Sequence, residues 1–257
     1  MTVSFVLAST DHGSLIVNRH DQRMVDDRGY GVGLQLLTNG VFDREVVEAG
    51  LVVLAQRRQH FGDGVVCVDC GANIGPFTVS WAHQMAGWGS VLAFEPQERL
   101  FYALAGNLAL NNLSNARALW AAVGAENGSI GVPVLDYDVP SSFGSLELRA
   151  SPAVESIGQP VDYSRTVTVP MRTIDSLGLA RLDLLKVDVE GMELEVLRGA
   201  LETIERCRPV IIAEHIKVGP EGLVDALRGL GYVDQWQLGI DLLAMHPDDP
   251  TQGVVRV

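Results

Sequence analysis

The stretch Val65-Val-Cys-Val-Asp-Cys-Gly-Ala-Asn-Ile-Gly-Pro-Phe-Thr78 decides how this 257-residue chain is organised. Residues 65–68 are uncharged and mostly β-branched, a pattern typical of a strand buried on both faces. The strand ends at Asp69 and the chain turns through 71–75. Pro76 then stands at a natural first helical position, because its missing N–H is not needed there. This order predicts a site where backbone N–H groups approach a nucleotide-like ligand.

The spacing of the glycines narrows the choice of ligand. The pattern is D-x-G-x-x-x-G, whereas dinucleotide sites have G-x-G-x-x-G. The acid before the turn would repel a pyrophosphate but suits a cationic ligand, and S-adenosylmethionine carries an ammonium and a sulfonium. A second acid, Glu95, ends the next apolar run, 91–95, where a carboxylate can hold two ribose hydroxyls. The alternative is an ordinary strand–helix turn that binds nothing, and the two acids argue against it.

Five segments, in order, resemble the FkbM-type methyltransferases, a family of class I S-adenosylmethionine-dependent enzymes. They are V-D-C-G-A-N-I-G at 68–75, F-E-P at 94–96, N-L-x-L-N-N-L at 107–113, A-V-G at 122–124 and L-L-K-V-D-V-E-G at 184–191. The resemblance covers roughly residues 29–214, and the last segment is its most specific part. Cys70 departs from the family, which more often has an apolar residue such as valine there. The resemblance implies methyl transfer to sugars, polyketides or other secondary metabolites.

We expect the cofactor to contact three places in the chain: the glycine turn, the second acid with the proline after it, and the end of the third strand. The predicted cofactor-binding residues are Asp69, Gly71, Ala72, Asn73, Ile74, Gly75, Phe77, Thr78, Glu95, Pro96 and Ala122.

The composition sets outer limits on the function. A net charge of −13 and a pI near 4.8 argue against a surface that follows nucleic-acid phosphates. No apolar run reaches the 18 residues of a membrane span, and the short run 3–8 has no preceding positive charge, so a secretory signal is not expected. Three cysteines fit a reducing compartment. We therefore expect a cytoplasmic protein without nucleic-acid or membrane partners.

The order of predicted elements indicates an α/β protein of the class I methyltransferase (Rossmann-like) kind. Its seven-stranded, mostly parallel sheet would be closed by an antiparallel hairpin of 232–238 and 240–245. We divide the chain into an N-terminal cover segment, 1–60, and an S-adenosylmethionine-binding domain, 61–257. The predicted elements are strands at 4–7, 14–17, 117–123, 182–188 and 209–214, and helices at 46–58, 97–110, 192–207 and from 220 to about 230.

The alternation of strands and helices breaks between residues 128 and 170. This segment is rich in Gly, Pro and Ser and has no convincing amphipathic helix, although 130–135 and 165–169 read as strands. Its position after the third strand would place it beside the ligand. We interpret it as an inserted, partly mobile substrate lid; the alternative is a featureless linker.

Four predicted strands end in an acid: Asp69, Glu95, Asp188 and Glu214. Such acids converge at the ligand edge of a parallel sheet. With the first two assigned to the cofactor, we expect the catalytic residues to be Asp188, Glu190, Glu214 and His215. Lys186, in an apolar strand, reads as a structural ion-pair partner, and Glu190 could equally serve the N-terminus of the next helix.

Two routes can remove the proton of a hydroxyl acceptor. His215 is the histidine placed to act as a base at neutral pH, with Glu214 orienting it. The other route is a divalent cation such as magnesium held by the carboxylates. We favour the base and assign no metal-binding residues, because no H-x-x-H or D-x-D spacing among these acids fixes a metal cage; magnesium is possible but not favoured.

The predicted function is S-adenosylmethionine-dependent O-methylation of a hydroxyl on a small molecule. N-methylation of a small-molecule amine is an alternative, since a neutral amine needs no strong base. A domain that binds cofactor without catalysis and serves as an interaction module is another, although the acids beyond Glu95 argue against it. The sequence leaves the acceptor and the oligomeric state open.

Overall fold

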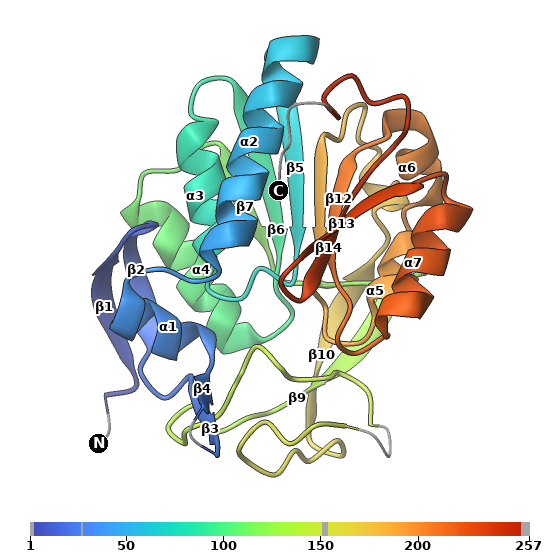
Figure 1. Cartoon of the computed structure of the whole chain (residues 1–257). Helices are drawn as coiled ribbons and strands as arrows, with labels where there is room; N and C mark the ends of the chain where they lie inside the picture. The colour runs from blue at the N-terminus through green and yellow to red at the C-terminus, as the bar shows by residue number, and fades with distance from the viewer. Residues whose placement is uncertain (1–2, 27, 151–153, 253–257) are drawn as a thin grey trace.

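The computed structural model of the chain describes residues 3–26, 28–150 and 154–252. At its centre lies a seven-stranded sheet in the order β13-β14-β12-β11-β5-β6-β7 (Figure 1). The strands are β5 (Val65–Cys70), β6 (Gly89–Phe94), β7 (Ala116–Leu119), β11 (Leu184–Val187), β12 (Val210–Glu214), β13 (Asp234–Leu238) and β14 (Asp241–Met245).

Five neighbouring strands of this sheet, from β12 to β7, run parallel. The hairpin β13–β14 adds two antiparallel strands beside β12. The predicted fold class, a mostly parallel seven-stranded sheet closed by a hairpin, is confirmed.

Helices cover both faces of the sheet, because every central strand is apolar on both sides. One face carries α2 (Arg44–Phe61), α3 (Pro76–Gln84) and α4 (Glu98–Leu110), and the other carries α5 (Glu193–Arg198), α6 (Leu201–Cys207) and α7 (Pro220–Gly229). Buried apolar side chains form one cluster under each set of helices. The predicted helices at 46–58, 97–110 and 220–230 are confirmed.

The predicted helix at 192–207 is wrong in one respect: it is two helices, α5 and α6. The helix is interrupted at Gly199. This glycine packs so closely on Gly124 that a Cβ at residue 199 would lie 2.1 Å from the Gly124 carbonyl oxygen. Leu201, the first residue of the second helix, is 47% exposed.

The N-terminal part forms a hairpin of β1 (Phe5–Thr10) and β2 (Gly13–Asn18), as predicted. Beyond it lie β3 (Arg23–Val25), β4 (Arg28–Tyr30) and α1 (Val32–Asn39), which the sequence did not indicate. His12, in the turn between β1 and β2, is only 3% exposed. Its Nδ1 lies 2.8 Å from the Ser80 hydroxyl, and burial lowers its pKa to about 4.

The predicted third strand, 117–123, is divided between two sheets. β7 ends at Leu119, and β8 (Ala122–Val123) pairs instead with β10 (Thr166–Arg172). On its other side β10 pairs with β9 (Gly128–Pro133). The two strands expected inside the lid segment, residues 128–170, are therefore present as β9 and β10. Between them, residues 134–150 and 154–165 contain no helix or strand.

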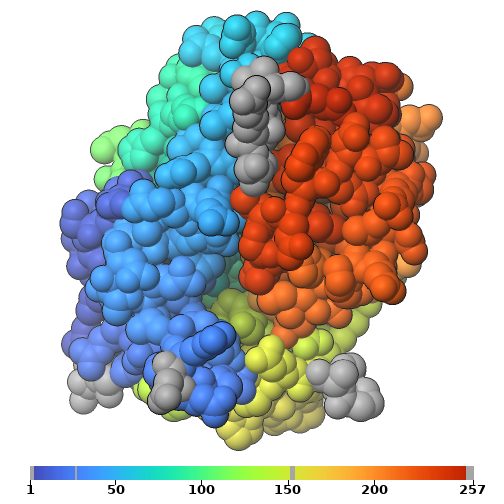
Figure 2. All heavy atoms as spheres, in the orientation of Figure 1, coloured from blue at the N-terminus to red at the C-terminus, as the bar shows by residue number. Residues whose placement is uncertain are grey.

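Buried polar contacts fasten the lid segment to the rest of the molecule. The Asp21 carboxylate accepts the N–H of Phe143 in the lid and the N–H of Gly33 in α1. Gln97, at the start of α4, donates from Nε2 to the Phe143 carbonyl at 2.8 Å and accepts from the Tyr137 hydroxyl at 2.9 Å. Figure 2 shows the lid (yellow) meeting the N-terminal part (blue) and the C-terminal part (orange) on one face of the molecule.

Candidate active site

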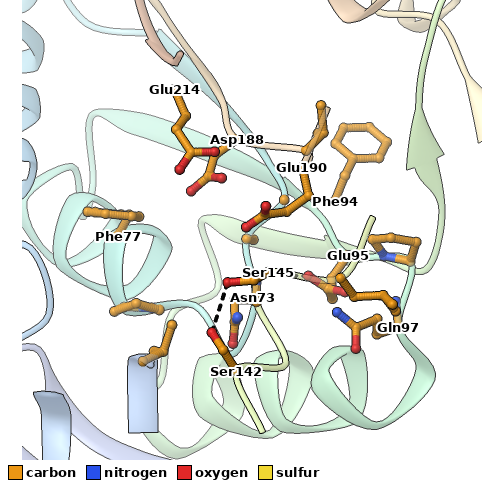
Figure 3. A pocket seen from close by; sticks show the side chains of 18 of the residues that line it. Asn73, Phe77, Phe94, Glu95, Gln97, Ser142, Ser145, Asp188, Glu190 and Glu214 are labelled. Carbon is orange, nitrogen blue, oxygen red and sulfur yellow. Dashed lines mark hydrogen bonds between the residues drawn. The ribbon is translucent and has the colours of Figure 1, made fainter. Parts of the chain in front are cut away.

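A pocket of about 1250 Å³, including its mouth open to solvent, lies at the carboxyl ends of the parallel strands. Its walls come from the glycine turn after β5, the ends of β6, β11 and β12, the segment around α1, and the lid segment. This is the edge of an open parallel sheet at which ligands bind. Figure 3 shows the side chains that face the pocket.

The glycine turn has the backbone shape that its residue types require. Gly71, Asn73 and Gly75 all have positive φ values, of 82°, 52° and 90°. A Cβ on Gly71 would lie 1.7 Å from the Asp188 carbonyl oxygen, and one on Gly75 would lie 2.5 Å from the Leu104 side chain. The glycines thus allow the turn to pack against the chain itself. This packing brings the loops after β5 and β11 together.

Glu95 lies at the pocket wall, at the end of β6, and is 3% exposed. Its two carboxylate oxygens accept the backbone N–H groups of Asn73, at 2.9 Å, and Gln97, at 2.8 Å. Burial raises the pKa of Glu95 to about 8, against the lowering effect of these two N–H donors. The carboxylate is therefore fixed in position, and each oxygen keeps a lone pair for a ligand hydroxyl.

The structure divides the predicted cofactor-binding residues into two groups. Those lining the pocket are Gly71, Ala72, Asn73, Phe77, Glu95, Pro96 and Ala122. Asp69, Ile74, Gly75 and Thr78 lie behind the wall and are buried. The Asp69 carboxylate accepts the Thr78 hydroxyl at 2.6 Å, so its contact is to the start of α3.

Lys186 forms the ion pair that the sequence predicted. Its ammonium, 1% exposed, lies 2.8 Å from Asp188 Oδ2 and 4.6 Å from the centre of the Phe77 ring. Burial alone would lower the pKa of Lys186, but the carboxylates of Asp188, Asp241 and Asp69 raise it above its ordinary value. Lys186 is therefore a fixed positive charge behind the pocket.

Asp188, Glu190 and Glu214 form a carboxylate cluster, in which one oxygen of each residue lies within 4.8 Å of the others. All three line the pocket, and Figure 3 shows their carboxylates pointing toward one another. Burial, followed by the charge of Asp188, raises the pKa of Glu214 to about 9 and that of Glu190 well above its usual range. One oxygen of Glu190 and one of Glu214 are buried without a hydrogen-bond partner in the described part of the chain.

His215, the fourth predicted catalytic residue, is not brought to this cluster. It follows Glu214 in the chain but is not among the described residues that line the pocket. Its Nε2 is buried without a hydrogen-bond partner among them.

The sequence analysis missed several residues that face the pocket. Asp241 lies opposite Glu214 in the β12–β14 pairing, and Asp43 precedes α2. Burial raises the pKa of Asp241 to about 7 and also raises that of Asp43. The register of the hairpin could have revealed Asp241, since Gly239 marks its turn. Asp43 gave no such signal.

The lid segment, which the sequence analysis placed beside the ligand, reaches the pocket, and so does Gln97, which the sequence analysis did not single out. The lid residues that line it are Ser142, Gly144, Ser145, Leu146 and Leu148. Ser142 and Ser145 hydrogen-bond each other through their hydroxyls at 2.8 Å (Figure 3). Gln97 follows Glu95 by two residues and forms the same wall.

These residues fit S-adenosylmethionine. Glu95 can accept its ribose hydroxyls, and an apolar strip beside Glu95, with Pro96, Ala122 and Met192 in it, suits an adenine. The unpartnered oxygens of Glu190, Glu214 and Asp241 suit a ligand that carries positive charge. The sheet order places the cluster on β11 and β12, across β5 from Glu95 on β6, at the end of the pocket opposite the ribose position.

The sheet and this pocket define a class I methyltransferase fold, whose cofactor is S-adenosylmethionine. The methyltransferase FkbM domain matches residues 69–233. The chain therefore belongs to the FkbM methyltransferase family.

The chain is similar to methyltransferases of three organisms. Methyltransferase 1 of Beauveria bassiana is 32% identical over 154 residues, which cover 54% of this chain and 59% of the relative. Methyltransferase sdnD of Sordaria araneosa is 31% identical over 182 residues, 62% of this chain and 70% of the relative. A hexuronic acid methyltransferase of Haloferax volcanii is 26% identical over 163 residues, which cover 62% of this chain and 59% of the relative.

Among solved structures, an FkbM methyltransferase from Methylobacillus flagellatus is 18% identical, with a TM-score of 0.47. The match covers 72% of this chain and 43% of that one. The chain thus spans less than two thirds of the length of several proteins it resembles. Within the described residues no helix is long and apolar enough to cross a membrane.

Proposed function

We propose that the protein transfers the methyl group of S-adenosylmethionine to a hydroxyl group of a small molecule. The observation that carries this proposal is a single pocket with a fixed carboxylate at one end, Glu95, and three converging carboxylates at the other. Glu95 holds the ribose, so the sulfonium points toward the cluster, and an acceptor entering beneath the lid segment meets the methyl group there.

For this reaction the protein must mainly position the acceptor hydroxyl against the methyl group and allow one proton to be removed. The acceptor oxygen bonds to the methyl carbon, the sulfur–carbon bond breaks with its electron pair left on sulfur, and the hydroxyl proton must leave. The sequence favoured His215 as the base. Glu190 and Glu214 are better placed, since both line the pocket and His215 does not. Burial raises both pKa values, so the deprotonated form of each carboxylate is a stronger base than an ordinary one.

The charges of the pocket favour a neutral or cationic acceptor. Its titratable lining residues in the described part of the chain are acidic, except for Tyr30, and include Asp43, Glu95 and Asp241. A carboxylate-bearing acceptor would meet this wall without a cation to pair with. The acidic lining also keeps a small-molecule amine as the alternative acceptor, and a nucleic acid would be repelled from it.

The test combines cofactor binding with turnover. Calorimetry with S-adenosylhomocysteine and, separately, NAD should give binding of the first only. Methyl transfer from labelled S-adenosylmethionine should then be measured on matched sets of neutral glycosides, amino sugars and uronic acids. Transfer to hydroxyl groups of neutral or amino compounds supports the proposal. Transfer to nitrogen alone favours the amine alternative, and binding of NAD in place of S-adenosylhomocysteine would overturn both.

A further inference from the structure

We infer that the carboxylate cluster of Asp188, Glu190 and Glu214 is a binding site for a hard divalent cation, magnesium or manganese, at the end of the pocket where the acceptor hydroxyl enters. Only the catalytic role of the ion, not its binding, rests on the proposed function. The binding site itself is argued from the geometry of three side chains and from the groups that surround them.

The first observation is the shape of the cluster. Three carboxylate oxygens lie within 4.8 Å of one another. Two oxygens on opposite sides of Mg²⁺ lie about 4.2 Å apart, twice its bond length of about 2.1 Å, so a small inward movement would close the cluster around an ion. The three residues supply oxygen ligands without sulfur or nitrogen, which favours magnesium or manganese over zinc. The open side of the pocket leaves room for water and an acceptor hydroxyl.

The second observation is a buried oxygen without a partner. Glu214 is 7% exposed, and its Oε2 is buried without a hydrogen-bond partner in the described residues. The Glu214 carboxylate points into the cluster (Figure 3). Buried carboxylate oxygens are nearly always hydrogen-bonded or bound to a metal. Glu190 Oε2 also has no hydrogen-bond partner there, although the Lys217 ammonium lies 3.9 Å from it. The buried Glu214 oxygen, in a cluster with the carboxylates of Asp188 and Glu190, indicates a ligand that the protein itself does not supply.

The third observation is the local balance of charge. Asp188 has one oxygen bound to Lys186, which leaves its other oxygen for the cluster. Lys217 lies 3.9 Å from Glu190 but is shared with Glu147 and Glu155. These two ammonium groups stand at the edges of the cluster, so its centre lacks a positive charge. A divalent ion supplies one and gains three oxygen ligands that are held in place by strand ends.

The backbone supports the position of the middle ligand. Glu190 has a φ of 54° and Gly191 a φ of 97°, so the loop after β11 turns sharply and directs the Glu190 side chain back toward Asp188. The neighbouring Glu193 accepts the N–H groups of Val189 and Gly191, which fixes the turn. A left-handed conformation at a non-glycine residue is unusual and is retained where the surroundings require it.

An ion here would act on the acceptor hydroxyl. Coordination lowers the pKa of a bound hydroxyl, so its proton can leave to water. The resulting alkoxide oxygen bonds to the methyl carbon while the sulfur–carbon bond breaks. Glu190 and Glu214 would then hold the ion and no longer act as the general base, the role that the proposed function gives them in the absence of an ion.

Binding can be tested without turnover by titrating the protein with Mn²⁺ and following the free-ion signal by electron paramagnetic resonance. The titration is repeated with saturating S-adenosylhomocysteine. We expect one saturable ion per chain, displaced by Mg²⁺. Glu214→Gln and Glu190→Gln should each weaken binding by at least about tenfold, and the exposed Glu126→Gln, which removes the same charge elsewhere, should leave it unchanged. Using two variants keeps the test valid if one of them fails to fold, which circular dichroism would reveal.

The outcomes separate this inference from the proposed function. Absence of saturable Mn²⁺ binding in a protein that still binds S-adenosylhomocysteine overturns the metal site and leaves the methyltransferase proposal standing. Mn²⁺ binding that survives both substitutions also overturns it, since the ion then lies elsewhere. Absence of S-adenosylhomocysteine binding counts against the proposed function, whatever the ion does.

Discussion

Glu95 offers the sharpest test of how the cofactor is held, because its carboxylate has two roles that substitutions can separate. It accepts the N–H groups of Asn73 and Gln97, and in our proposal it also accepts two ribose hydroxyls. Glu95→Ala removes both. Each buried N–H left without an acceptor costs about 1–3 kcal/mol, so the free energy of unfolding should fall by about 2–6 kcal/mol.

Glu95→Gln separates the two roles more cleanly. The amide keeps one acceptor oxygen, so only one backbone N–H loses its partner, and unfolding should become easier by about 1–3 kcal/mol. The charge-assisted contact to the ribose, worth about 2–3 kcal/mol, is lost in both variants. The Kd for S-adenosylhomocysteine should therefore rise by about 30- to 150-fold. The exposed Glu126→Gln should change neither quantity.

The assay is calorimetric titration with S-adenosylhomocysteine, paired with urea denaturation of the same samples. The stability measurement is needed because a partly unfolded variant would bind weakly only because less of it is folded. A well-folded Glu95→Gln protein whose Kd stays within about threefold of the wild type would refute the reasoning. The ribose would then be held by another group.

Three further outcomes are expected. Gly71→Ala would place a Cβ on the Asp188 carbonyl oxygen, so it should lower the free energy of unfolding by about 3 kcal/mol or more. Gly87→Ala is the control, because Gly87 has the same φ of 82° and nothing within 4 Å of its Cβ position, and it should cost only about 1–2 kcal/mol. Equal losses in urea denaturation would contradict this prediction. The folded-state pKa of Glu214, about 9, lies above its ordinary value of 4.5, so the unfolded chain releases this proton at a lower pH than the folded protein. Without a bound ion, the free energy of unfolding should therefore fall as pH rises from about 5 to 9. A free energy of unfolding that rises over this range would contradict the prediction. Lys186→Met, which breaks the ion pair with Asp188, should destabilise the protein by about 3 kcal/mol. This lies at the low end of the range for a buried ion pair, because 28% of the Asp188 side chain is exposed. An unchanged urea midpoint would show that this ion pair does not stabilise the fold.

The fold was predictable because its central strands are short apolar runs with clear ends. The hairpin at Gly239 and the parallel order of the other strands followed from turn residues and alternation. The errors occurred where contacts between distant parts of the chain determine where a helix or strand ends. The helix break at Gly199 depends on its close approach to Gly124, which no local pattern reveals. The third strand leaves its sheet after Leu119 to pair with β10, and this pairing spans about 50 residues of chain.

The candidate site was predictable only as far as strand ends define it. Asp188 and Glu214 were found because parallel strands end at one edge, and Glu190 because it lies in the loop that follows. The lid residues that line the pocket come from a segment without a repeating pattern, so neither their contacts nor the anchoring by Asp21 could be read from it. The direction of a side chain after the last strand residue is equally hidden, which is why His215 was grouped with Glu214.

Acids of the same chemical type at neighbouring strand ends have different roles because their surroundings compensate their charge differently. Asp69 is wholly buried, and its charge is partly compensated by the Thr78 hydroxyl and the Lys186 ammonium, although its Oδ1 has no hydrogen-bond partner in the described chain. Glu95 is compensated by two backbone N–H groups. Glu214 Oε2 has no hydrogen-bond partner in the described chain, and the charge of Lys186 lowers the pKa of Glu214 by less than burial raises it. Ionised carboxylates that are buried without compensation are too unfavourable to persist. The missing compensation at Glu214 must therefore come from a bound proton or from a positively charged ligand, and the high pKa of this residue and its affinity for a cation are two consequences of the same deficit.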